Sequence, residues 1–166
     1  PGEELVAMCH EAGIPVTAAP GAAACITALT ISGLSTRRFV FEAFLPTDKK
    51  ERKRVLVSLK EETRTIVMYE APHRLLRTLI LLRETLGNRK ISICKELTKR
   101  HETVFGTTID EAAAYYEDHE ARGEYVLIIE GRSEAEMIQK ERARWEEFSI
   151  EEHMQQYFDK GMSKKE

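Results

Sequence analysis

Cysteine, aromatic residues and long apolar runs are all scarce in this sequence of 166 residues. The three cysteines, Cys9, Cys25 and Cys94, are widely spaced and lie in apolar surroundings. They predict small buried thiols in a reducing cytoplasm, and they exclude a disulfide framework. No group of Cys and His residues has the spacing of zinc ligands, so we expect no structural metal.

No apolar run approaches the roughly 20 residues that a membrane-spanning helix needs, and no secretory signal opens the chain. We therefore expect a cytoplasmic protein without a membrane partner. Aromatic residues make up only 7% of the chain, which predicts no stacking platform for single-stranded nucleic acid. Because the net charge is only −3, any basic surface must be local.

What is present predicts an α/β protein with a mixed β-sheet flanked by helices. The expected strands cover residues 39–45, 64–69, 90–97, 102–107 and 124–130. The expected helices cover residues 49–60, 72–86 and 109–118. The strand 64–69 has little polarity and should be central, whereas 90–97 and 102–107 are suited to a hairpin. Thr108 and Glu111 have the spacing of a capping box.

The first residues do not fit this sheet. Residues 3–12 predict a helix, 14–19 a strand, and 22–31 an alanine-rich helix with almost no charge. A helix and one strand cannot bury themselves, so residues 1–21 are interpreted as the remnant of a preceding domain. Residues 22–131 then form the α/β domain and 132–166 a helical tail. Since the chain opens within one sequence pattern and closes at the start of a predicted helix, we expect a fragment of a longer protein.

The densest basic run predicts contact with nucleic-acid phosphates. It consists of Lys49, Lys50, Arg52, Lys53 and Arg54. The alternative is the solvated face of an ordinary helix.

Four segments carry a family resemblance. They are residues 20–34 with Pro20-Gly21-Ala22-Ala23-Ala24, residues 39–46, the run Tyr69-Glu70-Ala71-Pro72-His73-Arg74-Leu75-Leu76, and Lys95-Glu96-Leu97-Thr98-Lys99 followed by residues 123–131. In order and spacing they resemble the tetrapyrrole methylase superfamily. The run from Glu70 to Arg74 favours its ribosomal RNA branch over the cobalamin and sirohaem branches.

The resemblance implies two α/β domains with S-adenosyl-L-methionine in the cleft between them, of which this chain holds the C-terminal one. It implies methyl transfer to the ribose 2′-hydroxyl of a cytidine in 16S ribosomal RNA of the small subunit, by a homodimer. A cofactor cleft with only one wall would leave this fragment inactive alone.

By the same resemblance, Ala23 and Ala24 lie at the methionine end of the cofactor or its ribose, Glu70 beside it, and Gly123 and Glu124 near the adenine. Small side chains at a helix start do let a ligand approach backbone N–H groups. The ordinary alternatives are close helix packing, a helix-dipole partner for Glu70, and a plain glycine at a strand start.

Because a 2′-hydroxyl is a poor nucleophile, the reaction benefits from a positioned base. Glu70, Glu96 and His101 are the candidates in this chain. The sequence does not choose among them, and the alternative is a base in the missing domain. His73 and Arg74 at a helix start, with Lys95 and Lys99 near the charged loop, are further candidates for RNA phosphates. The alternative for all of these is solvated surface.

Two other functions stay open. One is a C-methyltransferase of the precorrin or sirohaem pathway, acting on a tetrapyrrole ring carbon; the basic run counts against it. The other is a non-catalytic module for RNA binding or dimerisation.

Overall fold

The computed structural model describes residues 2–133 and residue 138. Of the predicted tail 132–166, only Arg132, Ser133 and Ile138 therefore fall among the described residues. Five helices are found there: α1 (Glu3–Glu11), α2 (Ala24–Ile31), α3 (Lys49–Lys60), α4 (Leu75–Leu86) and α5 (Ile109–Asp118), with a 3-10 turn, η1 (Pro72–Arg74), before α4.

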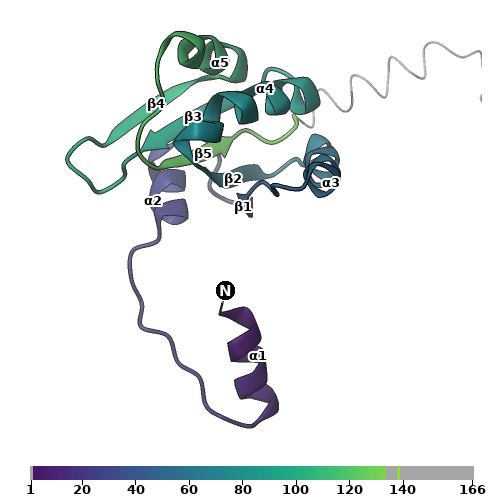
Figure 1. Cartoon of the computed structure of the whole chain (residues 1–166), viewed down its shortest axis with the longest axis vertical. Coiled ribbons are helices and arrows are strands. Elements are labelled where there is room, and N and C mark those ends of the chain that lie inside the picture. The colour runs from purple at the N-terminus through teal and green to yellow at the C-terminus, as the bar shows by residue number, and fades with distance from the viewer. Residues whose placement is uncertain (1, 134–137, 139–166) are drawn as a thin grey trace, which may run out of the picture.

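A single mixed sheet forms the centre of the domain (Figure 1). Its strands are β1 (Phe39–Phe44), β2 (Thr65–Glu70), β3 (Lys90–Lys95), β4 (Thr103–Thr108) and β5 (Tyr125–Ile129). Their order is β1-β2-β5-β3-β4, with β1 and β2 parallel and the other pairs antiparallel. The predicted mixed sheet and hairpin are confirmed. The strand predicted to be central, β2, lies inside the sheet, and β5 occupies the middle.

One face of the sheet packs against α3, α4 and α5. Leu75, Leu79 and Leu82 of α4 are fully buried there, as the helical spacing of its leucines predicted. Gly87 ends α4 with a φ of +81°, a conformation that favours glycine. The predicted capping box of Thr108 and Glu111 starts α5. This face supplies most of the apolar burial.

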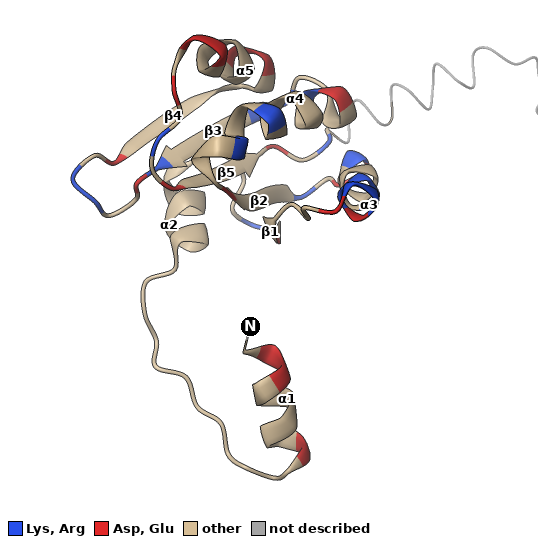
Figure 2. Cartoon of the chain, viewed as in Figure 1, with Lys and Arg blue, Asp and Glu red and all other residues tan. Residues whose placement is uncertain are grey.

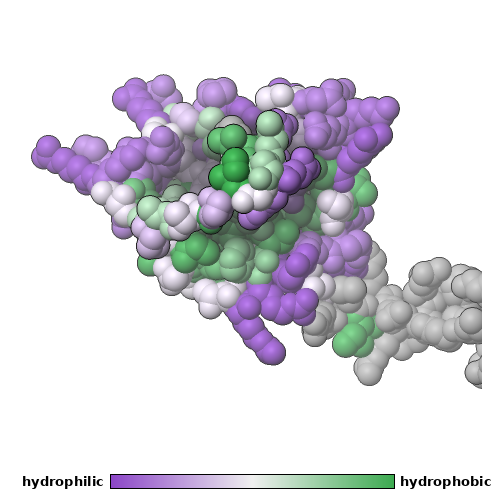
Figure 3. All heavy atoms as spheres, turned by 90° about the horizontal axis from the view of Figure 1, so that it is seen from below, coloured by the Kyte–Doolittle hydropathy of each residue, from purple (hydrophilic) through white to green (hydrophobic). Residues whose placement is uncertain are grey.

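The other face is covered only in part, by α2. Ala28 and Leu29 pack there against Val67, Val126 and other apolar residues of β2, β3 and β5. Beyond α2 the phenylalanines of β1 stay open to solvent; Phe41 is 45% and Phe44 54% exposed. Figure 3, which views the molecule from the side of α1, shows apolar side chains gathered in the middle and hydrophilic ones around them.

The N-terminal segment does not join the sheet. Helix α1 buries none of its residues, and an extended exposed chain leads from it to α2 (Figure 1). The strand predicted over residues 14–19 is wrong. Those residues pair with no strand of the described chain, and an apolar alternating segment forms a strand only where a partner completes its hydrogen bonds.

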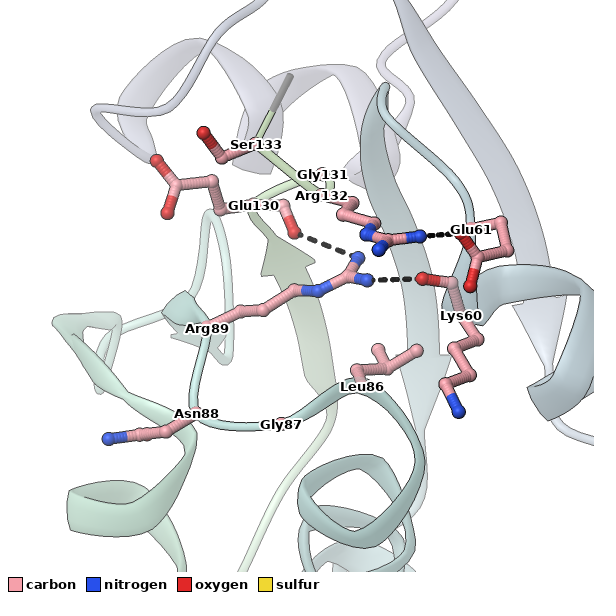
Figure 4. Close-up of a pocket in the computed structure, with 10 residues that line it drawn as sticks. All are labelled: Lys60, Glu61, Leu86, Gly87, Asn88, Arg89, Glu130, Gly131, Arg132 and Ser133. Atoms are coloured by element: carbon pink, nitrogen blue, oxygen red, sulfur yellow. Dashed lines mark hydrogen bonds and ion pairs between the residues drawn. The ribbon is translucent and has the colours of Figure 1, made fainter. Parts of the chain in front are cut away.

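At the end of the sheet where β5 finishes, Arg89 joins three segments beside a cavity of about 340 Å³. The Arg89 guanidinium donates to the carbonyl oxygens of Lys60, Glu62 and Glu130, and Arg132 forms an ion pair with Glu61 (Figure 4). These contacts hold the end of β5 to the end of α3. Within the described chain, no helix has the length and apolar character to cross a membrane.

Candidate functional site

The residues predicted to be functional come together at one end of the sheet. Strands β1, β2 and β3 end there and β5 begins there, so that Glu70, Tyr125 and Lys95 form a row across three paired strands. The turn η1 and the start of α3 follow β2 and β1 at this same end. In open α/β sheets, ligands bind at the carboxyl ends of the strands. The position suits a binding site.

Helix α2 presents its first residues openly at this end. Ala23 and Ala24 are exposed, and no side chain caps the helix. The Cys25 backbone N–H donates to the Tyr69 hydroxyl at 3.3 Å. Partial burial, followed by the neighbouring Cys25 thiol, raises the pKa of Tyr69, so its hydroxyl stays protonated and acts as a neutral anchor. Small side chains at an open helix start leave room for a ligand to approach the backbone.

Three aromatic rings lie next to this helix start. A bulge between Phe41 and Ala43 inserts an extra residue into β1. Phe41 and Phe44 therefore both reach the Tyr69 ring, at centroid distances of 5.2 and 5.6 Å. Sequence reasoning missed Tyr69, although it precedes Glu70 in the run that carried the resemblance. These rings give the uncharged helix start an apolar surface.

Glu70 points to the opposite face from Ala23 and Ala24. Its side chain is completely buried beneath α4. The carboxylate accepts from the Ala71 N–H at 2.8 Å and from the Thr78 hydroxyl at 2.6 Å, and its oxygen lies 3.4 Å from the Arg74 Nε. In this arrangement Glu70 fixes the turn η1 and the start of α4.

Glu96 and Lys99 form an ion-pair cluster with the start of β5. The Glu96 carboxylate accepts from the Glu124 N–H at 2.8 Å and from Lys99 at 3.1 Å, and Lys99 also pairs with the Glu124 carboxylate at 2.9 Å. The Glu124 N–H and then Lys99 lower the pKa of Glu96, while Glu124 and Glu96 raise the pKa of Lys99.

Gly123 makes this cluster possible. Its φ is +88°, and an added Cβ would lie 2.7 Å from the Glu96 side chain. Only glycine lets the carboxylate approach this closely without strain.

Three of the predicted basic residues line one pocket. Arg52 from α3 and His73 and Arg74 from η1 line a cavity of about 300 Å³, together with Arg77 of α4. Arg52 donates to the Thr47 carbonyl oxygen and Arg74 to that of Leu45, so the turn after β1 holds both guanidinium groups. Arg77 was not predicted, because its place on α4 beside the turn is set by tertiary packing.

The other predicted cations are more dispersed. Lys49, Lys50, Lys53 and Arg54 are exposed on α3, where Figure 2 shows the basic residues gathered. His101 is exposed in the loop between β3 and β4, and Lys95 is half-buried at the end of β3. Among the described residues, no group of three or more His, Cys, Asp or Glu side chains is placed to hold a metal ion.

The fold and this site define an α/β domain with an open surface at the carboxyl ends of its strands. The family model of the tetrapyrrole (corrin/porphyrin) methylases matches residues 1–113. The chain belongs to this family, as the resemblance had indicated.

Two curated relatives share the name ribosomal RNA small subunit methyltransferase I. The protein from Synechocystis sp. is 43% identical over 165 residues, which cover 99% of this chain and 57% of that protein. The protein from Bacillus subtilis is 41% identical over 166 residues, which cover 100% of this chain and 56% of that protein. The chain thus spans little more than half the length of these relatives.

Among solved structures, the chain is similar to uroporphyrin-III C-methyltransferase from Thermus thermophilus, complexed with S-adenosylhomocysteine. The TM-score is 0.53 at 19% identity, covering 78% of this chain and 58% of that one. This similarity supports the α/β fold.

Proposed function

We propose that this chain is part of an S-adenosyl-L-methionine-dependent methyltransferase acting on the ribose 2′-hydroxyl of a cytidine in 16S ribosomal RNA. The family membership and the shared name of the two curated relatives support the methyltransferase and its ribosomal substrate. The 2′-oxygen, the cytidine, the homodimer and the cytoplasmic location rest on the resemblance of the sequence.

The observation that carries the proposal is the convergence of two surfaces at one end of the sheet. The α2 side offers small residues next to the aromatic rings of β1 and β2. Helix α2 carries no charged residue, as its tan colour in Figure 2 shows. The α3 side offers a pocket lined by Arg52, His73, Arg74 and Arg77. An uncharged wall suits the cofactor, and a basic pocket suits a phosphate of the RNA backbone.

On the cofactor side, we assign Ala23 and Ala24 to the approach of the ligand to the α2 backbone. Gly123 and Glu124 present the backbone at the start of β5. Bound S-adenosyl-L-methionine supplies an electrophilic methyl group, so the protein needs chiefly to align the acceptor oxygen with it. Glu70 contributes by holding η1, because its carboxylate is buried on the other face.

Within this chain, Glu96 and His101 are the candidates for the general base that accepts the proton of the 2′-hydroxyl. The Glu96 carboxylate is occupied by the Glu124 N–H and Lys99, which lower its pKa and make it a weak proton acceptor. His101 is exposed in the loop that follows β3, and an imidazole nitrogen can accept a proton. We therefore propose His101 as the first candidate within this chain. Lys95 and Lys99 would attract the RNA backbone nearby.

Charge removal in the basic pocket tests the RNA part of the proposal. We expect the double variant His73→Ala/Arg77→Ala to weaken binding of a 16S RNA fragment and to flatten its dependence on salt. For every phosphate that the protein no longer neutralises, the slope of log K against log salt concentration falls by roughly 0.7 to 0.9. Binding is measured by fluorescence anisotropy at several salt concentrations.

Arg83→Ala is the matched control, since Arg83 lies on the same helix but pairs with Asp110. If the double variant leaves the salt slope unchanged, as the control does, the pocket does not bind RNA phosphate. Tight binding of a tetrapyrrole precursor, with no RNA binding, would favour the C-methyltransferase alternative.

A further inference from the structure

A second groove lies on the helical face, between the edge strand β4 and the end of α5. Its volume is about 480 Å³. Five of its nine lining residues carry rings: Phe105, Tyr115, Tyr116, His119 and Tyr125. The low aromatic content had predicted no stacking platform. The fold nevertheless gathers four of the chain's few Phe and Tyr rings here, with the His119 ring beside them, because β4, β5 and α5 meet at this edge.

Tyr115 is the centre of this aromatic groove. Its ring stacks on the His119 ring at a centroid distance of 4.0 Å and an angle of 3°. Phe105 and Tyr116 lie at 5.4 and 5.1 Å from it. Tyr115 is 44% and Phe105 37% exposed, so both rings keep surface that a further planar group can cover.

Two further rings, one of them buried, hold the exposed ones in place. Tyr116 packs edge-to-face on Tyr125, whose hydroxyl accepts from the Arg122 N–H. Burial, with the Tyr125 contact, raises the pKa of Tyr116, so this wall carries no phenolate charge that would repel an anion. The groove is therefore a supported, neutral aromatic surface.

Cations lie at the end of the groove nearest the proposed active site. Lys95 lines it and pairs in register with Tyr125, in the same row as Glu70. The loop from β3 to β4 continues from Lys95 and carries exposed Arg100. Figure 2 shows this loop with a basic tip and acidic residues on its flanks. At the opposite border, the charge of Glu120 is matched by Arg122 at 2.6 Å.

We propose that this groove binds an unpaired base of the RNA substrate by stacking on Tyr115 and Phe105, with Lys95 and the β3–β4 loop contacting the adjacent phosphates. The inference rests on the proposed function and gives the RNA a second anchor, separate from the basic pocket formed by α3, η1 and α4. Aromatic faces with a neighbouring cation are the chemistry that recognises single-stranded nucleotides.

The test compares two probes on the whole chain: a labelled 12-nucleotide cytidine RNA, and inorganic polyphosphate of similar length, which has charges but no bases. We expect Tyr115→Leu to weaken RNA binding roughly 5- to 150-fold, the range found when a stacking ring is removed. Tyr115→Phe should bind like the unchanged chain, because it keeps the ring. Polyphosphate should bind all three proteins equally.

Lys49→Ala/Lys50→Ala gives the opposite pattern and serves as the electrostatic control. It should weaken both probes and reduce the salt slope, whereas Tyr115→Leu leaves the slope unchanged. Circular dichroism should show Tyr115→Leu folded, since the ring is exposed.

The results separate a failure of the groove proposal from a failure of the proposed function. RNA binding that Tyr115→Leu does not alter would overturn the groove while leaving the proposed function intact. An unchanged chain that binds neither probe would overturn both. A chain that sediments as a dimer, and as a monomer after Tyr115→Leu, would overturn the proposal by showing the groove to be an interface between copies.

Discussion

At the scale of single residues, the Glu62 carboxylate holds Arg64 in the turn that precedes β2. It accepts from the Arg64 backbone N–H at 2.8 Å and from its guanidinium at 2.6 Å. The Arg64 side chain is chiefly responsible for lowering the pKa of Glu62 from 4.5 to about 2. Because the folded pKa is depressed, the stabilisation is present above pH 4.5 and is lost as pH falls toward 2.

We therefore expect Glu62→Gln to reduce the free energy of unfolding at neutral pH by about 1 kcal/mol, a modest value because Arg64 is partly solvated. The difference should shrink steadily below pH 4.5. Urea unfolding at a series of pH values measures it, with the exposed Glu84→Gln as control. A difference independent of pH would show that the ion pair is not its source.

At the scale of elements, the capping box decides where α5 begins. The Thr108 hydroxyl accepts from the Glu111 N–H, and the Glu111 carboxylate accepts from the Thr108 N–H. Thr108→Ala should cost about 1 kcal/mol of stability, whereas Thr108→Ser should cost little. Thermal unfolding compares them with Thr30→Ala, which removes an exposed hydroxyl within α2. Equal losses at Thr108 and Thr30 would contradict a capping role.

Sequence patterns predicted the elements from residue 39 onward because each is bounded by local signals, such as Gly87 and the Thr108 cap. The strand at 14–19 failed because pairing is a tertiary property that no local pattern contains. The same limit applies to the site. The sequence indicated the segments around Glu70 and Gly123, but which face each side chain takes, and the gathering of Arg77 and Tyr115 with their neighbours, depend on the folded sheet.

At the scale of the whole molecule, the open wall beside α2 explains why we expect the chain alone to bind its cofactor weakly. It spans 56–57% of the length of the two curated relatives described, and its exposed rings at Phe41 and Phe44 face solvent. If the cofactor lies between two walls, as the family resemblance implies, most of its burial is absent here. A binding free energy weaker by about 3 to 4 kcal/mol raises the dissociation constant about 100- to 1000-fold.

The most direct test is methyl transfer from radiolabelled S-adenosyl-L-methionine to small ribosomal subunits that lack the modification. The assay compares the complete gene product that contains this sequence with the 166-residue chain alone. Nucleoside analysis of the RNA then identifies the labelled product. We predict label in 2′-O-methylcytidine for the complete product and none for the chain alone. Label on a base, or on a tetrapyrrole precursor in place of RNA, would contradict the proposed function.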